Sequence, residues 1–183
     1  MSFRIICLAK QVPDTRNVGK DAMKADGTVN RAALPAIFNP EDLNALEQAL
    51  RIKDTRPDAE VILLTMGPAR AAEIIREGFY RGADKGYLIT DRKFAGSDTL
   101  ATSYVLSHAI RKLAPFNLII SGRQAIDGDT AQVGPQTAEK LGIPQVTYAE
   151  EIISLTDDEI VIKRRLEKGV EIVRAIMPLA ITV

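Results

Sequence analysis

The chain has 183 residues, 46% hydrophobic and 26% charged, and its 24 lysines and arginines balance its 24 aspartates and glutamates. This indicates a globular protein and excludes the strong basic character of chains that bind nucleic acid or anionic membranes. A single cysteine and a single histidine exclude a disulfide framework, a thiolate metal site and a histidine metal cluster.

Four short apolar runs predict the strands of a parallel sheet that is buried on both faces. They are residues 4–9, 59–66, 85–90 and 117–121. The first run is too short for a signal peptide and lacks a small-residue cleavage site, and no run approaches the ~20 residues of a membrane-spanning helix. We therefore expect a cytoplasmic or organelle-matrix protein with no nucleic-acid partner and no membrane insertion.

Helical patterns with clear end signals separate these runs. Asn39 is predicted to cap a helix that starts at Pro40. A second helix is predicted to begin after Pro68 and to end at Gly82 in a left-handed conformation.

Two further helices are predicted later in the chain. Ser97 or Asp98 is expected to cap the third, whose apolar stripe is Ala101, Val105 and Ala109. The fourth is expected to run from about Thr130 to Leu141.

The alternation of strands and helices predicts an α/β fold, with a Rossmann-like, mostly parallel sheet flanked by helices. Two stretches depart from the alternation. Residues 24–34 predict an inserted hairpin with a turn at Asp26-Gly27, and residues 159–176 predict an antiparallel hairpin with a turn at Lys168-Gly169. We expect residues 1–183 to form a single nucleotide-binding domain.

Ligands of open parallel sheets bind beyond the carboxyl ends of the strands. The loops that leave those ends are residues 9–15, 65–68, 90–99 and 121–130. The last begins the stretch "GRQAIDGDTAQVGPQ" (122–136), whose glycines and following helix suit an anion, with Arg123 and Thr130 as additional donors. The alternative is a plain turn in which Asp129 or Thr130 caps the helix, and neither a Walker A motif nor GxGxxG is present.

Several long segments resemble the β subunit of electron transfer flavoprotein. They are "CLAKQVPDT", "NPEDLNALEQALRIKD", "TMGP", "FAGSDTLATS" and "GRQAIDGDTAQVGPQTAEKLGIPQVTYAEEI", and the family's signature hairpin is matched by "VIKRRLEKGVEIV" (161–173). The resemblance implies an α-subunit partner and electron transfer between flavin and an acyl-CoA-type or other flavin dehydrogenase. The chain would be an electron-carrying oxidoreductase component rather than a stand-alone enzyme.

The resemblance also implies a nucleotide in the β subunit, FAD in the electron-bifurcating group and AMP in simple carriers. The motifs "KQVPDT", "SDTLATS" and "DGDTAQVGPQ" are more similar to the bifurcating group, so FAD is expected and AMP is the alternative. The predicted cofactor-binding residues are Ala9, Lys10, Gln11, Val12, Asn39, Met66, Gly67, Asp98, Thr99, Thr102, Gly122, Arg123, Gln124, Asp127, Gly128, Asp129, Thr130, Gln132, Val133 and Gly134.

Asp98, Thr99 and Thr102 are expected near the flavin, and residues 122–134 at the pyrophosphate. From spacing alone, these three would be a helix cap and ordinary first-turn residues; the resemblance favours the flavin. Members of the family continue for several tens of residues beyond the position of Val183, in an arm that docks on dehydrogenases. The expected unit is therefore a nucleotide-binding core without that arm.

A different class of protein shares these features. An ATP-binding signalling or stress-type α/β domain would have the same fold and late glycine loop, but no flavin. Cys7 is expected to be a buried packing residue and His108 a structural one.

Overall fold

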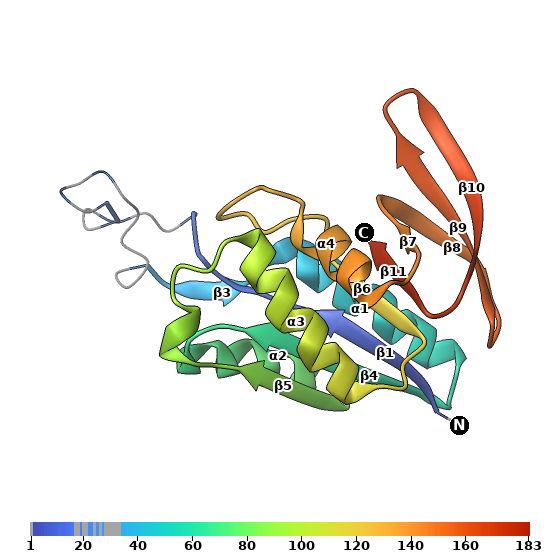
Figure 1. Cartoon of the computed structure of the whole chain (residues 1–183), viewed down its shortest axis with the longest axis horizontal. Coiled ribbons are helices and arrows are strands. Elements are labelled where there is room, and N and C mark those ends of the chain that lie inside the picture. Colours follow the sequence, from blue (N-terminus) through green and yellow to red (C-terminus); the bar gives the residue numbers. More distant parts are fainter. Residues whose placement is uncertain (1, 17–18, 20–21, 24, 26, 28–33) are drawn as a thin grey trace.

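The structure is a computed structural model that describes residues 2–16, 19, 22–23, 25, 27 and 34–183. Its centre is a six-stranded sheet in which every neighbouring pair of strands is parallel (Figure 1). In spatial order the strands are β5 (Lys85–Ile89), β4 (Ala59–Met66), β1 (Phe3–Leu8), β6 (Leu118–Ser121), β11 (Leu179–Thr182) and β7 (Gln145–Val146). This confirms the predicted α/β fold.

Helices cover both faces of this sheet. They are α1 (Pro40–Thr55), α2 (Ala72–Arg81), α3 (Thr99–Leu113) and α4 (Val133–Leu141), with two short 3-10 turns, η1 (Ala69–Ala71) and η2 (Arg92–Phe94). Side chains from α1 and α2 share one apolar cluster, and side chains from α3 and α4 share the other. The sheet is therefore the middle layer of three.

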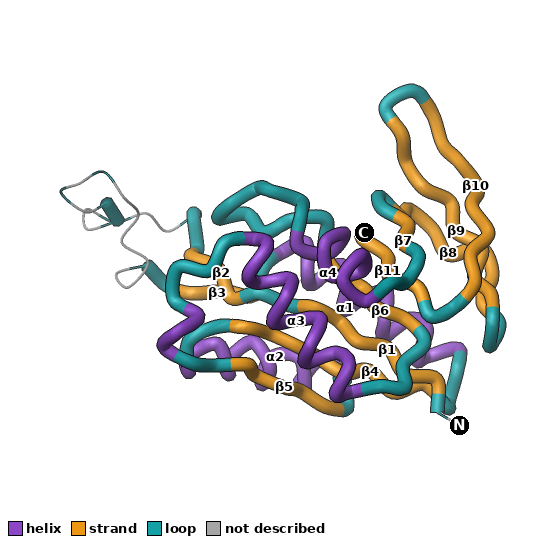
Figure 2. The backbone as a smooth tube through the Cα atoms, viewed as in Figure 1, coloured by secondary structure: helices purple, strands orange, loops and turns teal. Residues whose placement is uncertain are grey.

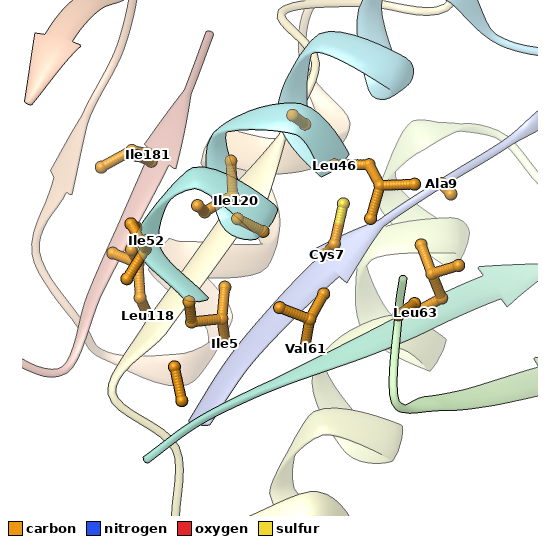
Figure 3. Packing of buried hydrophobic residues seen from close by; sticks show 14 of the residues in the cluster. Ile5, Cys7, Ala9, Leu46, Ile52, Val61, Leu63, Leu118, Ile120 and Ile181 are labelled. Atoms are coloured by element: carbon orange, nitrogen blue, oxygen red, sulfur yellow. The ribbon is translucent and has the colours of Figure 1, made fainter. Parts of the chain in front are cut away.

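Alternation along β1 explains why the strands are apolar throughout. Ile5 and Cys7 belong to the cluster beneath α1, whereas Ile6 and Leu8 belong to the cluster on the opposite face. Figure 3 shows Leu46 of α1 close to Cys7. Cys7 is fully buried, as predicted for a packing residue.

A smaller antiparallel sheet lies beside the parallel one (Figure 2), and its residues Ile160 and Ile162 belong to the apolar cluster beneath α1. Its strands, in spatial order, are β10 (Gly169–Ile176), β9 (Glu159–Leu166) and β8 (Ala149–Leu155). The pairing of β9 with β10 confirms the hairpin predicted at 159–176.

A two-stranded ribbon joins β2 (Gln11–Pro13) to β3 (Ala36–Phe38). The hairpin predicted at 24–34 falls between these strands, almost entirely outside the described residues. The sequence did not predict the ribbon, because neither strand is longer than three residues.

Two helix predictions were wrong in detail. The fourth helix starts at Val133 rather than near Thr130, because Asp129 and Ala131 have left-handed φ angles of 50° and 53°. The fully buried residues of α3 are Ser103, Leu106, Ser107 and Ile110 rather than the predicted stripe. Both serines are tolerated there because each hydroxyl donates to the carbonyl three residues earlier.

Candidate functional site

The strand order places a topological switch point between β1 and β6. From β1 the chain passes through α1 to β4, and from β6 it passes through α4 to β7, on the other side of the sheet. Since α1 and α4 cover opposite faces, the backbone opens at the carboxyl ends of β1 and β6, where ligands of such folds bind. A cavity of about 850 Å³ lies at this edge.

Most of the predicted cofactor-binding residues line this one cavity. They are Ala9, Lys10, Met66, Gly67, Thr99, Thr102, Gly122, Arg123, Gln124, Gly128, Asp129, Thr130, Gln132, Val133 and Gly134. They come from the segments that follow β1, β4, β5 and β6. The loops that leave the carboxyl ends of these strands therefore meet at one edge of the sheet, as expected.

Five predicted residues do not line the cavity. The Gln11 side chain donates to the Arg70 carbonyl, and Val12 is buried in the β2–β3 ribbon. Asn39 holds the loop after β6, Asp98 caps α3, and Asp127 pairs with Lys10.

The segment between β5 and α3 contributes more than was predicted. Thr90, Asp91, Arg92 and residues 94–97 all line the cavity. The signal was present, because the loop 90–99 leaves the same sheet edge as the others, but only its last two residues were selected.

The residues at the start of α1 hold the loop that follows β6. The Asn39 side chain was predicted to cap α1, which is wrong, since among the described residues it makes no capping bond. Its Nδ2 donates to the Gln124 carbonyl (2.9 Å) and its Oδ1 accepts from the Ile126 N–H (3.2 Å). Glu41 accepts from the Gln124 N–H (2.8 Å) and pairs with the Arg123 guanidinium (3.0 Å).

Asp42 joins the backbone on the two sides of the switch point. One carboxylate oxygen accepts from the Lys10 N–H (2.8 Å) and the other from the Gly122 N–H (3.1 Å). The side chain lines the cavity and the residue is only 7% exposed. Burial raises the pKa of Asp42 to about 7, although the Asn39 amide, the two N–H groups and the Lys10 charge oppose this increase.

A second contact ties the same segments together. The Lys10 ammonium lies 2.6 Å from the Asp127 carboxylate. This ion pair joins the segment after β1 to the loop after β6.

Two glycines of the loop differ in what surrounds them. A Cβ on Gly122 would lie 2.6 Å from the Glu41 carbonyl carbon and 2.8 Å from the Asp42 nitrogen, so only glycine fits against α1. A Cβ on Gly128 would meet no atom within 4 Å. The packing of the described residues therefore requires Gly122 but not Gly128, which faces the cavity.

The start of α4 offers unpaired backbone donors. In the described part of the chain, no acceptor is found for the N–H groups of residues 130–134, and all five residues line the cavity. The left-handed residues Asp129 and Ala131 precede the helix. A helix N-terminus carries partial positive charge, so this wall suits an anion.

Comparison with known proteins assigns the family. A profile of the electron transfer flavoprotein domain matches residues 26–183. The chain is 50% identical over 186 aligned residues to the electron transfer flavoprotein subunit beta of Megasphaera elsdenii, with 98% of this chain and 68% of the relative covered. The chain belongs to the electron transfer flavoprotein family, as a β subunit. Its role is therefore in electron transfer.

Two other relatives are similar over nearly the whole chain. Subunit CarD of the caffeyl-CoA reductase-Etf complex of Acetobacterium woodii is 49% identical, with 98% of this chain and 68% of the relative covered. Protein FixA of Bradyrhizobium diazoefficiens is 46% identical, with 97% and 62% covered.

The electron transfer flavoprotein resemblance assigned three residues to the flavin, and the structure places only two of them in the cavity lining. Thr99 and Thr102 line the cavity, and the Thr99 hydroxyl donates to the Gln132 side chain (2.9 Å). Asp98 instead caps α3, accepting from the Ala101 N–H (2.8 Å). The cap interpretation of Asp98 is thus correct.

The signature hairpin of the electron transfer flavoprotein family lies away from the cavity lining. Its basic residues have local partners: Lys163 and Arg165 pair with Glu150, and Arg164 donates to the Thr147 hydroxyl.

None of the helices in the described ranges has the length and apolar character needed to cross a membrane.

Proposed function

We propose that this β subunit binds FAD in the cavity, with AMP as the alternative ligand, and works with an α subunit to pass electrons to or from a dehydrogenase. The names of two relatives support a partner that acts on acyl-CoA thioesters. They are CarD and the acryloyl-CoA reductase electron transfer subunit gamma of Anaerotignum propionicum, which is 52% identical to this chain. The bound flavin would supply the redox chemistry, and the side chains would bind and orient it.

The observation that carries the proposal is the run of residues 130–134 along the cavity wall, whose N–H groups have no acceptor in the part of the chain that the structure describes. The positive end of α4 and these donors together suit a pyrophosphate. Gly128 adds to this, because the space beside its Cα is open, so a ligand is able to approach the backbone closely.

Cavity size favours FAD over AMP. A volume of about 850 Å³ is toward the upper end of the roughly 300–1,000 Å³ typical of ligand pockets. Residues 94–97, Thr99 and Thr102 line the cavity in addition to the 122–134 loop. We propose that the flavin lies beside residues 94–102, with the hydroxyls of Thr99 and Thr102 as hydrogen-bonding groups for it.

The Gly128→Val variant tests the site. The new Cβ would meet no atom within 4 Å, so we expect little change in thermal unfolding and at least tenfold weaker FAD binding, measured by quenching of flavin fluorescence. Unaltered FAD affinity would contradict the proposed place of the pyrophosphate.

The identity of the bound nucleotide is tested by measuring the nucleotide content of the heterodimer. The chain is combined with a cognate α subunit, and flavin and adenine nucleotide are counted after the complex is denatured. Two FAD per heterodimer is the expected result. One FAD with one AMP would exclude the FAD proposal for this cavity and leave the family assignment unchanged.

A further inference from the structure

Asp42 occupies an unusual place for an ionisable group, in the wall of a cavity that suits an anionic ligand. We propose that Asp42 is a positioning residue that couples nucleotide binding to the uptake of a proton. This inference rests on the proposed function, because it requires that a phosphate-bearing nucleotide enter the cavity.

The geometry makes Asp42 the joint between the two loops. Its two oxygens hold the N–H groups of Lys10 and Gly122, which follow the neighbouring strands β1 and β6. A Cβ on Gly122 would lie 2.7 Å from the Asp42 Oδ1, so the carboxylate is packed directly against the loop. It cannot turn away from an incoming ligand without releasing these contacts.

The charged groups around Asp42 leave its charge incompletely balanced. The Lys10 charge favours the ionised form of Asp42, but the Lys10 ammonium is already paired with Asp127. On α1 itself, Glu41 is turned to Arg123 of the β6 loop.

The other charged residues that line the cavity are Asp91, Arg92, Arg123 and Asp129. Two further ionisable side chains do not line it. Cys7 of β1 is buried nearby, and burial, together with the charge of Asp42, raises the pKa of its thiol. His108, the single histidine of the chain, does not line the cavity. Among the described groups, Asp42 is thus the cavity-lining group whose pKa of about 7 places its proton exchange near neutrality.

The sign of the coupling follows from the charges. A phosphate in the same cavity disfavours the ionised carboxylate, so it raises the pKa of Asp42 above about 7. Below that pH, Asp42 already holds its proton and binding takes up none. Above it, binding takes up as much as one proton, and affinity falls by at most about tenfold per pH unit until the pKa of the complex is passed.

The experiment is calorimetry of FAD binding to the 183-residue chain near pH 7.5, in buffers with different ionisation enthalpies. FAD is the probe because its pyrophosphate diester does not titrate near neutral pH. Wild type is expected to show buffer-dependent heat that corresponds to proton uptake. Asp42→Asn has nearly the same shape but no charge, so its heat is expected to be independent of buffer.

Glu41→Gln is the matched control, because Glu41 also lies in the first turn of α1 and holds the same loop but does not line the cavity. It should bind FAD more weakly and still take up the proton. Proton uptake by Asp42→Asn equal to that of wild type, or none by wild type, would overturn the inference alone. Absence of any FAD binding by wild type would overturn the proposed function and the inference with it.

If Asp42→Asn does not fold, a second measurement tests the same inference. Infrared difference spectra of wild type on FAD binding should gain a carboxylic-acid C=O band above pH 7. Spectra without that band would refute the inference.

Discussion

The two halves of the loop between β6 and α4 are built in different ways. Residues 122–126 are held by side chains of Asn39, Glu41 and Asp42. Residues 128–132 line the cavity, as residues 122–125 also do, but they include two left-handed non-glycine residues, Asp129 and Ala131.

The first half of the loop is therefore fixed by the protein itself, and the second half leaves space for a ligand. The first half fits against α1 so closely that a single added carbon would overlap the helix backbone. The second half has open space beside Gly128, and the N–H groups of residues 130–134 have no acceptor among the described residues. Substitutions in the first half should therefore change stability, and those in the second half should mainly change binding.

The largest effect on stability is expected for Gly122→Ala. Its Cβ would lie within 3 Å of backbone atoms of Glu41 and Asp42, so the start of α1 must shift. We expect a loss of about 2 kcal/mol in the free energy of unfolding, as for other overpacked positions, measured by urea denaturation.

Gly128→Ala is the matched control for that change. The same added carbon meets nothing within 4 Å, so the loss should stay below about 0.5 kcal/mol. Equal losses for the two alanines would show that the halves do not differ in support.

A smaller loss is expected for Asn39→Ala. Asn39 is fully buried, and its removal leaves the Gln124 carbonyl and the Ile126 N–H without their partners. The expected cost is about 1–2 kcal/mol by thermal or urea unfolding.

Gln124→Ala controls for the side chain that connects the two halves. It removes only an exposed hydrogen bond to Asp129 and should cost less than about 0.5 kcal/mol. A cost equal to that of Asn39→Ala would mean that α1 is not the main support of the loop.

The smallest effect on stability is expected for Ala131→Gly. Relief of the left-handed strain, about 1 kcal/mol, should nearly offset the greater entropy of glycine in the unfolded chain. FAD binding should weaken a few-fold, because the loop is less preorganised.

Ala125→Gly tests whether strain is the reason. Ala125 lies in the same loop without a positive φ angle, so the substitution should cost about 0.5–1 kcal/mol. If Ala131→Gly destabilised the protein by as much as Ala125→Gly, the strain argument would be wrong.

The features that the sequence predicted well depend on neighbouring residues in the chain. Gly82 has the expected left-handed conformation at the end of α2, Asp98 caps α3, and residues 159–176 form the expected hairpin. The gathering of loops at one edge was predictable too, because parallel strands bring their carboxyl ends together.

The features that were missed depend on contacts between distant segments. Asn39 has the pattern of a helix cap, and nothing near it in the sequence indicates that its partners are Gln124 and Ile126. The start of α4 was misplaced because Asp129 and Ala131 adopt a conformation more typical of glycine. The role of Asp42 was not predicted, because it depends on contacts with Lys10 and Gly122.

The place of β11 has a consequence for the order in which the protein is completed during synthesis. β11 pairs with β6 on one side and β7 on the other, and the Arg123 N–H donates to the Val183 carbonyl. During translation, β6 therefore has no partner strand on this side until residues 179–182 are made, after β8, β9 and β10. The loop beside the cavity acquires its backbone bond to Val183 only then, so this wall of the cavity is completed after residues 179–183 are made.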